Sequence, residues 1–148
     1  MPVPFADLQP EGPPSPLVRL SRQPRLPPEA RELLRRIDTE ATVALQYLAS
    51  VPGSGALATV RIEAARDRDA PDVVRAFLDL PPSEADAVLE AGRTAQDVLV
   101  ADLQTLLAAI REEMGTAAQA VALDARIQHR FIVDKYGASG LDRPDGGA

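Results

Sequence analysis

The sequence predicts an all-α protein: a single bundle of four to five helices, preceded by a disordered proline-rich arm and followed by a short disordered tail. Two long segments, 28–50 and 94–114, repeat apolar residues at the spacing of an amphipathic helix. Eight of the 14 prolines lie in residues 1–27, where they oppose helix formation. We therefore assign 1–27 to the arm, 28–137 to the bundle and 138–148 to the tail.

The composition of the 148 residues narrows the class of protein. Hydrophobic residues make up 45% of the chain and aromatic residues only 3%, so the core must be built from Leu, Ile, Val and Ala. The chain has no cysteine, which excludes disulfides and thiolate chemistry. A net charge of −6 argues against binding to nucleic acid or to an anionic membrane surface. No apolar run approaches the roughly 20 residues of a membrane span, and no signal peptide is evident, so we expect a cytoplasmic protein without membrane insertion.

The arm, residues 1–27, is expected to be extended or polyproline II in character. It either stays disordered or docks on a partner or on the bundle. Leu17, Val18 and Leu20 would be its apolar anchors in the second case.

The first helix is predicted over 28–50. Pro28 suits the first helical turn, where its missing N–H costs nothing. The segment Val51–Gly55 contains Pro and two Gly, which ends the helix. Its apolar side consists of Leu33, Leu34, Ile37, Ala41, Ala44, Leu45 and Leu48.

Two shorter helical segments are predicted over about 56–66 and 72–80, as a kinked pair across the core. Pro71 interrupts the pattern, and the sequence leaves open whether the second segment is a new helix or a kinked continuation. Phe77 lies on the apolar side of the second segment, which ends at Pro81-Pro82.

The central helix is predicted over 94–114. Thr94 is a good N-cap, and Asp97 three residues later completes a weaker version of the capping box. Gly115 is predicted to end this helix, since glycine adopts the left-handed C′ conformation most easily. Its apolar side consists of Leu99, Val100, Leu103, Leu106, Leu107, Ile110 and Met114.

A last helix is predicted from 117 to about 136, ending at Gly137. Its apolar residues fall on two sides, so we expect it to pack between neighbours as part of the core. His129 is expected at the edge of that core. One side holds Val121, Ala125, Ile132 and Tyr136; the other holds Leu123, Ile127 and Phe131.

Motifs for catalysis or metal binding are missing from the sequence. His129 is the only histidine, and no G-x-S-x-G nucleophile elbow accompanies it. Arg126 stands three residues before it, where a di-iron bundle needs glutamate. Zinc sites of the usual type need several Cys or His. We predict no catalytic residue, no cofactor and no metal.

One series of residues resembles a known group of proteins. It runs from Asp72-Val-Val-Arg-Ala-Phe-Leu-Asp-Leu-Pro-Pro82 through Gly92-Arg-Thr94 and the 99–107 leucines to His129-Arg-Phe131 and Lys135-Tyr-Gly137. This series, within residues 28–137, is similar to uncharacterised actinobacterial helical proteins. They in turn are distantly similar to the bromo-chloro-indolyl phosphate hydrolysis family found near toxic-anion resistance genes. The resemblance implies an all-helical fold in a bacterial cytoplasm, and supplies no catalytic residues.

The sequence favours a non-enzymatic interaction or scaffold protein that acts through its helix faces and through the arm. Its expected partner is another protein, and a two-fold homodimer is left open. The partner-binding candidates are Leu17, Val18, Leu20, Phe77 and His129. One alternative is a small-molecule-binding bundle, with His129 and the arginines of 61–68 as polar contacts. The other is a hydrolase, suggested by the family label alone, which would need His129 or Asp72.

Overall fold

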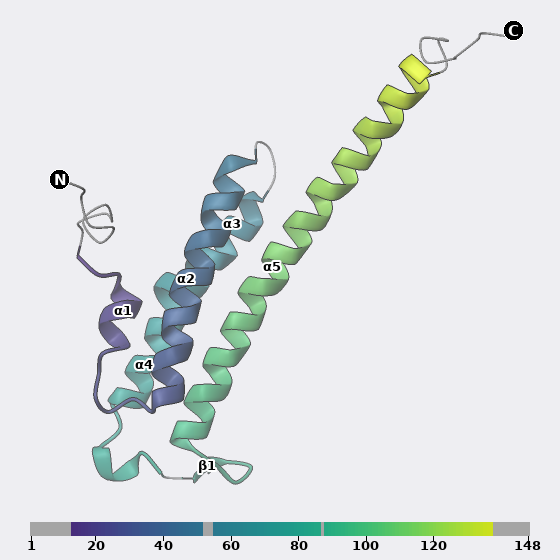
Figure 1. Ribbon diagram of the computed structural model, residues 1–148. Coiled ribbons are helices and arrows are strands. Elements are labelled where there is room, and N and C mark those ends of the chain that lie inside the picture. The colour runs from purple at the N-terminus through teal and green to yellow at the C-terminus, as the bar shows by residue number, and fades with distance from the viewer. Residues whose placement is uncertain (1–12, 52–54, 87, 138–148) are drawn as a thin grey trace, which may run out of the picture.

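The computed structural model describes residues 13–51, 55–86 and 88–137. Helices α2 (Pro28–Ser50), α3 (Ala56–Ala64), α4 (Ala70–Leu78) and the first half of α5 (Ala95–Ile132) pack side by side, and the short helix α1 (Pro16–Leu20) lies on the outside of this group (Figure 1). The predicted all-α bundle is confirmed. One core, made almost entirely of Leu, Ile, Val and Ala side chains, runs between these helices.

Helix α2 has the predicted bounds. It begins at Pro28 and ends at Ser50, before a segment that contains Pro52, Gly53 and Gly55. Gly55 has a φ of 83°, a backbone conformation that favours glycine. The buried residues of α2 follow helical spacing, as the sequence pattern predicts: Ala30, Leu33, Leu34, Ile37, Ala41, Ala44 and Leu48.

Helices α3 and α4 are joined without a loop. A π-helical turn, Ala65–Asp69, continues α3 directly into α4, so the second segment is a continuation of the first. Pro71 has no N–H to donate to the carbonyl four residues earlier, and a helix adapts to such a loss by widening locally. Ile62, Val74 and Phe77 of this joined rod are buried.

The arm is folded from residue 13 onward, so the expectation of disorder is wrong for residues 13–27. The Ser15 side chain accepts a hydrogen bond from the backbone N–H of Val18, which caps α1, and donates to Asp38 of α2 at 2.8 Å. Leu17 and Leu26 are fully buried. Residues 1–12 and the predicted tail 138–148 lie outside the described residues.

Arg25 fixes the end of the arm to α4. Its guanidinium donates hydrogen bonds to the backbone carbonyls of Leu78, at 2.8 Å, and of Leu80, at 2.5 Å. The Leu78 carbonyl lies at the C-terminal end of α4, where intrahelical donors are missing and a cation is favoured, and Leu80 lies two residues beyond that end.

A small antiparallel hairpin leads into α5. Strands β1 (Val88–Glu90) and β2 (Arg93–Thr94) pair around Ala91 and Gly92, which both have positive φ. Thr94 then caps α5: its side chain accepts from the N–H of Asp97, and the Asp97 carboxylate accepts from the N–H of Thr94, both at 3.2 Å. The predicted capping box is confirmed.

The prediction that Gly115 ends the central helix is wrong. Helix α5 passes through Gly115 without a break, runs to Ile132, and continues as a π-helical turn, Val133–Gly137. Glycine inside a helix costs about 1 kcal/mol relative to alanine, and the surrounding Ala, Glu, Gln and Met residues are strong helix formers. Gly115 is therefore tolerated in the interior of the helix, and unlike Gly55 and Gly92 it does not have a positive φ.

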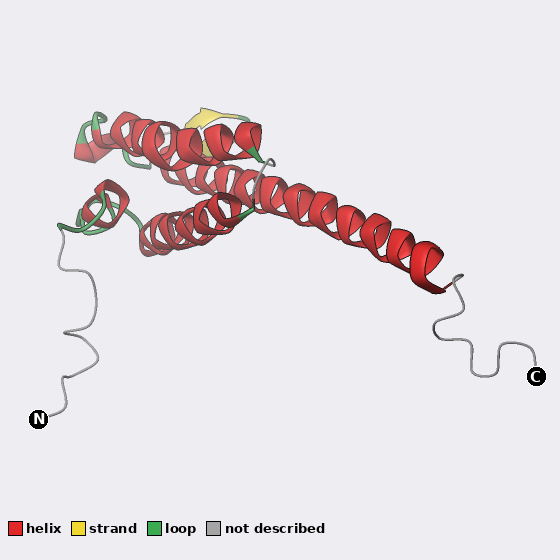
Figure 2. Cartoon of the chain, turned by 90° about the horizontal axis from the view of Figure 1, so that it is seen from above, coloured by secondary structure: helices red, strands yellow, loops and turns green. Residues whose placement is uncertain are grey.

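The predicted helix over 117–136 is the second half of α5, and its expected place in the core is also wrong. Every buried residue of α5 lies between Ala95 and Ala117. After Ala117, Val121 is half-buried and the other residues up to Tyr136 are exposed. This half projects beyond the other helices as a single rod (Figure 2).

Candidate functional site

Contacts between α5 and the bundle end just after Gly115. Arg111 donates two hydrogen bonds to Glu40 of α2, each at 2.7 Å. Arg61 of α3 pairs with Glu113 at 2.9 Å. Ala117 is the last buried residue. We call residues 118–137, from there to the last described residue, the extension; at 1.5 Å per residue it is about 30 Å long.

The extension carries three large apolar side chains in a row. Leu123, Ile127 and Phe131 follow one another at intervals of four residues, which places them on one side of the helix. Their side chains are 55%, 59% and 53% exposed. We call these three residues the outer row. Contiguous exposed apolar side chains are one of the features by which interaction surfaces are recognised, so the outer row is a candidate surface of this kind.

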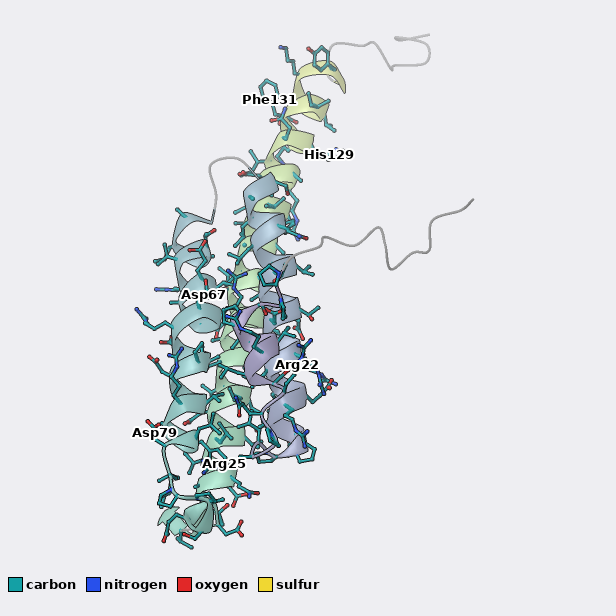
Figure 3. All side chains as sticks on the ribbon, turned by 90° about the vertical axis from the view of Figure 1, so that its left-hand side faces the viewer. Arg22, Arg25, Asp67, Asp79, His129 and Phe131 are labelled. Carbon is teal, nitrogen blue, oxygen red and sulfur yellow. The ribbon has the colours of Figure 1, made fainter. Side chains whose placement is uncertain are left out.

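His129 and Phe131 project on opposite sides of α5 (Figure 3). The expectation that His129 lies at the edge of the core is wrong, because the core ends twelve residues earlier at Ala117. His129 is exposed and remains accessible to a partner. At the end of the extension, the Lys135 ammonium lies 5.6 Å from the centre of the Phe131 ring and 5.2 Å from that of Tyr136, within the range of cation–π contact.

The other partner-binding candidates are placed differently. Leu17 and Phe77 are 1% and 4% exposed, and pack inside the core of their own chain. Val18 and Leu20 belong to α1 and are half-buried. The five candidates therefore do not form one surface, and within this fold Leu17 and Phe77 are not accessible to a partner.

The structure does not bring together the residues that a small-molecule-binding bundle or a hydrolase would need. Asp72 lines a hollow of about 380 Å³ between α4 and the start of α5, together with Asp102. His129 lies 27 residues after Asp102 on the same helix, about 40 Å away. The arginines of 61–68 are engaged in ion pairs: Arg61 with Glu113, Arg66 with Asp67 and Arg68 with Asp69.

Ion pairs shift the pKa values of Glu40 and Arg66 in the folded protein. The hydrogen bonds from Arg111 lower the pKa of Glu40 below its ordinary value, and the positive charges of Arg111 and Arg36 add to this effect. The hydrogen bond to Asp67 raises the pKa of Arg66, and the negative charge of Asp38 acts in the same direction. Of the two pairs, Arg111–Glu40 joins α5 to α2, whereas Arg66 and Asp67 are neighbours within one π-helical turn.

Within residues 13–51, 55–86 and 88–137, no three His, Cys, Asp or Glu side chains are grouped closely enough to hold a metal ion. In the same part of the chain, none of the helices combines the length and the apolar character needed to cross a membrane.

Sequence reasoning missed Leu123 and Ile127 as candidate site residues. The signal that could have found them is the pair of opposite apolar sides on the last helix. Both sides exist as predicted. The expectation that the bundle itself packs against both sides is wrong for the described residues, because both sides are exposed after Val121.

Comparison with known proteins adds no relative: no protein-family description, curated protein or solved structure matches the chain significantly.

Proposed function

We propose that the protein is a non-enzymatic interaction module, whose extension binds a helix of another protein through the outer row. The observation that carries this proposal is the exposure of Leu123, Ile127 and Phe131 on a rod that leaves the bundle. Burying a Leu, Ile or Phe side chain stabilises a complex by roughly 1.5–3 kcal/mol each. Three such side chains on one side of a helix supply a compact apolar centre for an interface.

The chemistry of the partner follows from the shape and charge of the extension. Residues spaced by four on a straight helix form a ridge that fits the groove of another helix. The extension has three basic residues, Arg126, Arg130 and Lys135, and two acidic ones, Asp124 and Asp134, whereas the whole chain carries −6. The partner we propose is therefore an amphipathic helix with large apolar side chains and acidic flanks. Ion pairs of Arg111 with Glu40 and of Arg61 with Glu113 attach α5 to the bundle just before the extension begins. We propose a cytoplasmic setting.

The test is affinity capture from a lysate of the organism that encodes the protein, followed by a binding measurement with the purified partner. The row variant carries Leu123→Glu and Ile127→Glu. The control variant carries Leu57→Glu and Val60→Glu on α3, whose side chains are 60% and 62% exposed. We expect the row variant to bind the purified partner at least tenfold more weakly, and the control variant to bind like the wild type. Equal binding by the row variant and the wild type, or the absence of a specific partner, would contradict the proposal.

A further inference from the structure

The side of α5 opposite the outer row carries a second line of residues, which has the spacing of a coiled coil. Its positions alternate in steps of four and three residues, and all six are exposed. We call this line the seam. It consists of Ala118, Ala122, Ala125, His129, Ile132 and Tyr136.

The seam continues the side of α5 that makes hydrogen bonds to α2 in the bundle. Arg111 and Gln104 stand one and two heptads before Ala118, in the same register. Arg111 pairs with Glu40 of α2, and Gln104 donates a hydrogen bond to Glu29 of α2 at 3.4 Å. From Ala118 onward, the seam residues are exposed in the structure.

The point where α2 leaves the seam is marked by a hollow. Its volume is about 380 Å³, and it lies between Val43 and Ala44 of α2 and Met114 and Ala118 of α5. Its lining is mostly apolar, and it opens at the first residue of the seam. A helix that occupied the seam would meet α2 at this hollow, so it would have to end close to Ala118.

We propose that a second copy of this chain occupies the seam, with the two extensions antiparallel. The first three seam residues are alanines and the last three are large. In the antiparallel arrangement Ala118 faces Tyr136 of the second copy, Ala122 faces Ile132, and Ala125 faces His129. Each pair is symmetric about residue 127, so one register satisfies all three, and each small side chain meets a large one.

The same register ends the second helix at the required place. Gly137 of the second copy lies level with Ala117, where α2 stops covering the seam. Tyr136 of the second copy then faces the hollow beside Ala118. The two copies therefore use the whole extension, and each helix takes the position along α5 that α2 occupies in the bundle.

A parallel pair does not fit this surface. The α5 helix of a parallel second copy would have to pass through the position of α2, next to Arg111 and Gln104. Its layers would also match alanine with alanine at one end and large side chains with each other at the other end, which packs unevenly. The antiparallel pair has one unfavourable feature. Arg126 lies near the symmetry axis, so it comes close to Arg126 of the second copy, and the two positive charges repel each other.

This inference concerns the side of α5 opposite the outer row and does not depend on the proposed function. Its test uses the absence of cysteine from the chain. Ala122→Cys and Ile132→Cys are made as two separate variants, and a mixture of the two is oxidised. We expect a disulfide in the mixture. Neither variant should link to itself. In the antiparallel pair, position 122 of one copy and position 122 of the other are ten residues apart along the helix axis, and the same holds for position 132. That is about 15 Å, beyond disulfide reach.

The control mixture combines Leu123→Cys with Phe131→Cys. These positions are also symmetric about residue 127 but lie in the outer row, so we expect no link between them. Efficient self-linking of Ala122→Cys, or equal linking in both mixtures, would overturn the proposal.

Sedimentation velocity of the full chain provides a second readout. We expect a dimer whose fraction rises with concentration, at least tenfold weaker association for Ala122→Glu, and no change for Leu123→Glu. Arg126→Gln should tighten the dimer, because it removes the like-charge approach. A wild-type chain that stays monomeric at all concentrations would overturn the seam proposal and would leave binding through the outer row to be decided by capture.

Discussion

Arg111 of α5 and Glu40 of α2 form an ion pair with two hydrogen bonds. The Arg111 Nε donates to Glu40 Oε1 and Nη2 donates to Oε2, each at 2.7 Å. The pair lies near the last point at which α5 is held by the bundle, six residues before the last buried residue, Ala117. It divides α5 into a half that belongs to the core and a half that projects from it.

Replacing either of two leucines of α5 by alanine should change the free energy of unfolding by different amounts. Leu103 is fully buried, whereas Leu123 is 55% exposed. We expect Leu103→Ala to lower the free energy of unfolding by about 2–5 kcal/mol, because it leaves a cavity in the core. Leu123→Ala should change it by about 0.5 kcal/mol or less at a concentration where the chain is monomeric. Denaturant unfolding measures both, and similar losses would show that the extension folds back onto the bundle.

Gly115→Ala should stabilise the protein. Gly115 lies inside a helix, and a Cβ atom added to it meets nothing within 4 Å. The expected gain in the free energy of unfolding is about 0.5–1 kcal/mol. A loss of stability would instead indicate a left-handed glycine that ends the helix, as the sequence pattern alone suggests.

Replacing Glu40 should change the dependence of stability on pH. Arg111 lowers the pKa of Glu40 in the folded protein below the ordinary 4.5, so the ionised carboxylate stabilises the fold above that pH. This contribution is lost as the pH falls through the lowered pKa. We expect Glu40→Gln to reduce the melting temperature at pH 7 and the difference from wild type to disappear in acid. Glu112→Gln, at an exposed position of α5 next to Arg111, is the control; a difference for Glu40→Gln that grows in acid would contradict the assignment.

Leu17→Ala tests whether the arm belongs to the fold. The Leu17 side chain is 1% exposed, and its helix is held by Ser15 and Asp38. We expect a loss of about 2–5 kcal/mol in the free energy of unfolding. Arg19→Ala, an exposed position of the same helix, should stay near wild type. If the two variants unfold alike, the arm does not dock as described.

The elements that the sequence predicts best carry their signals locally. Pro28 and the glycines after Ser50 bound α2, and Thr94 with Asp97 begins α5, because each signal acts through backbone groups within one turn. Gly115 predicts a helix end that the structure does not have, because whether a glycine ends a helix depends on the helix formers on both sides of it. The docking of α1 depends on tertiary contacts: Leu17 needs the bundle surface, and Ser15 needs Asp38, 23 residues away.

The candidate site was only half predictable. Helical spacing identifies both apolar sides of the last helix, and the structure keeps Leu123, Ile127 and Phe131 on one side and Ile132 and Tyr136 on the other. Spacing cannot say whether a neighbour comes from the same chain. That depends on the lengths of the other helices, since α2 and the joined α3–α4 rod are too short to cover α5 after Ala117.

Hydrogen exchange of the backbone amides along α5, measured at low and high protein concentration, tests most directly whether the extension is a docking element. A lone helix of about 20 residues without tertiary contacts is only marginally protected in water. We expect the amides of 99–114 to be equally protected at both concentrations, and those of 118–137 to become protected as the concentration rises. Strong protection of 118–137 at the lowest concentration, where the chain is monomeric, would mean that its own bundle covers the extension and would contradict the docking role.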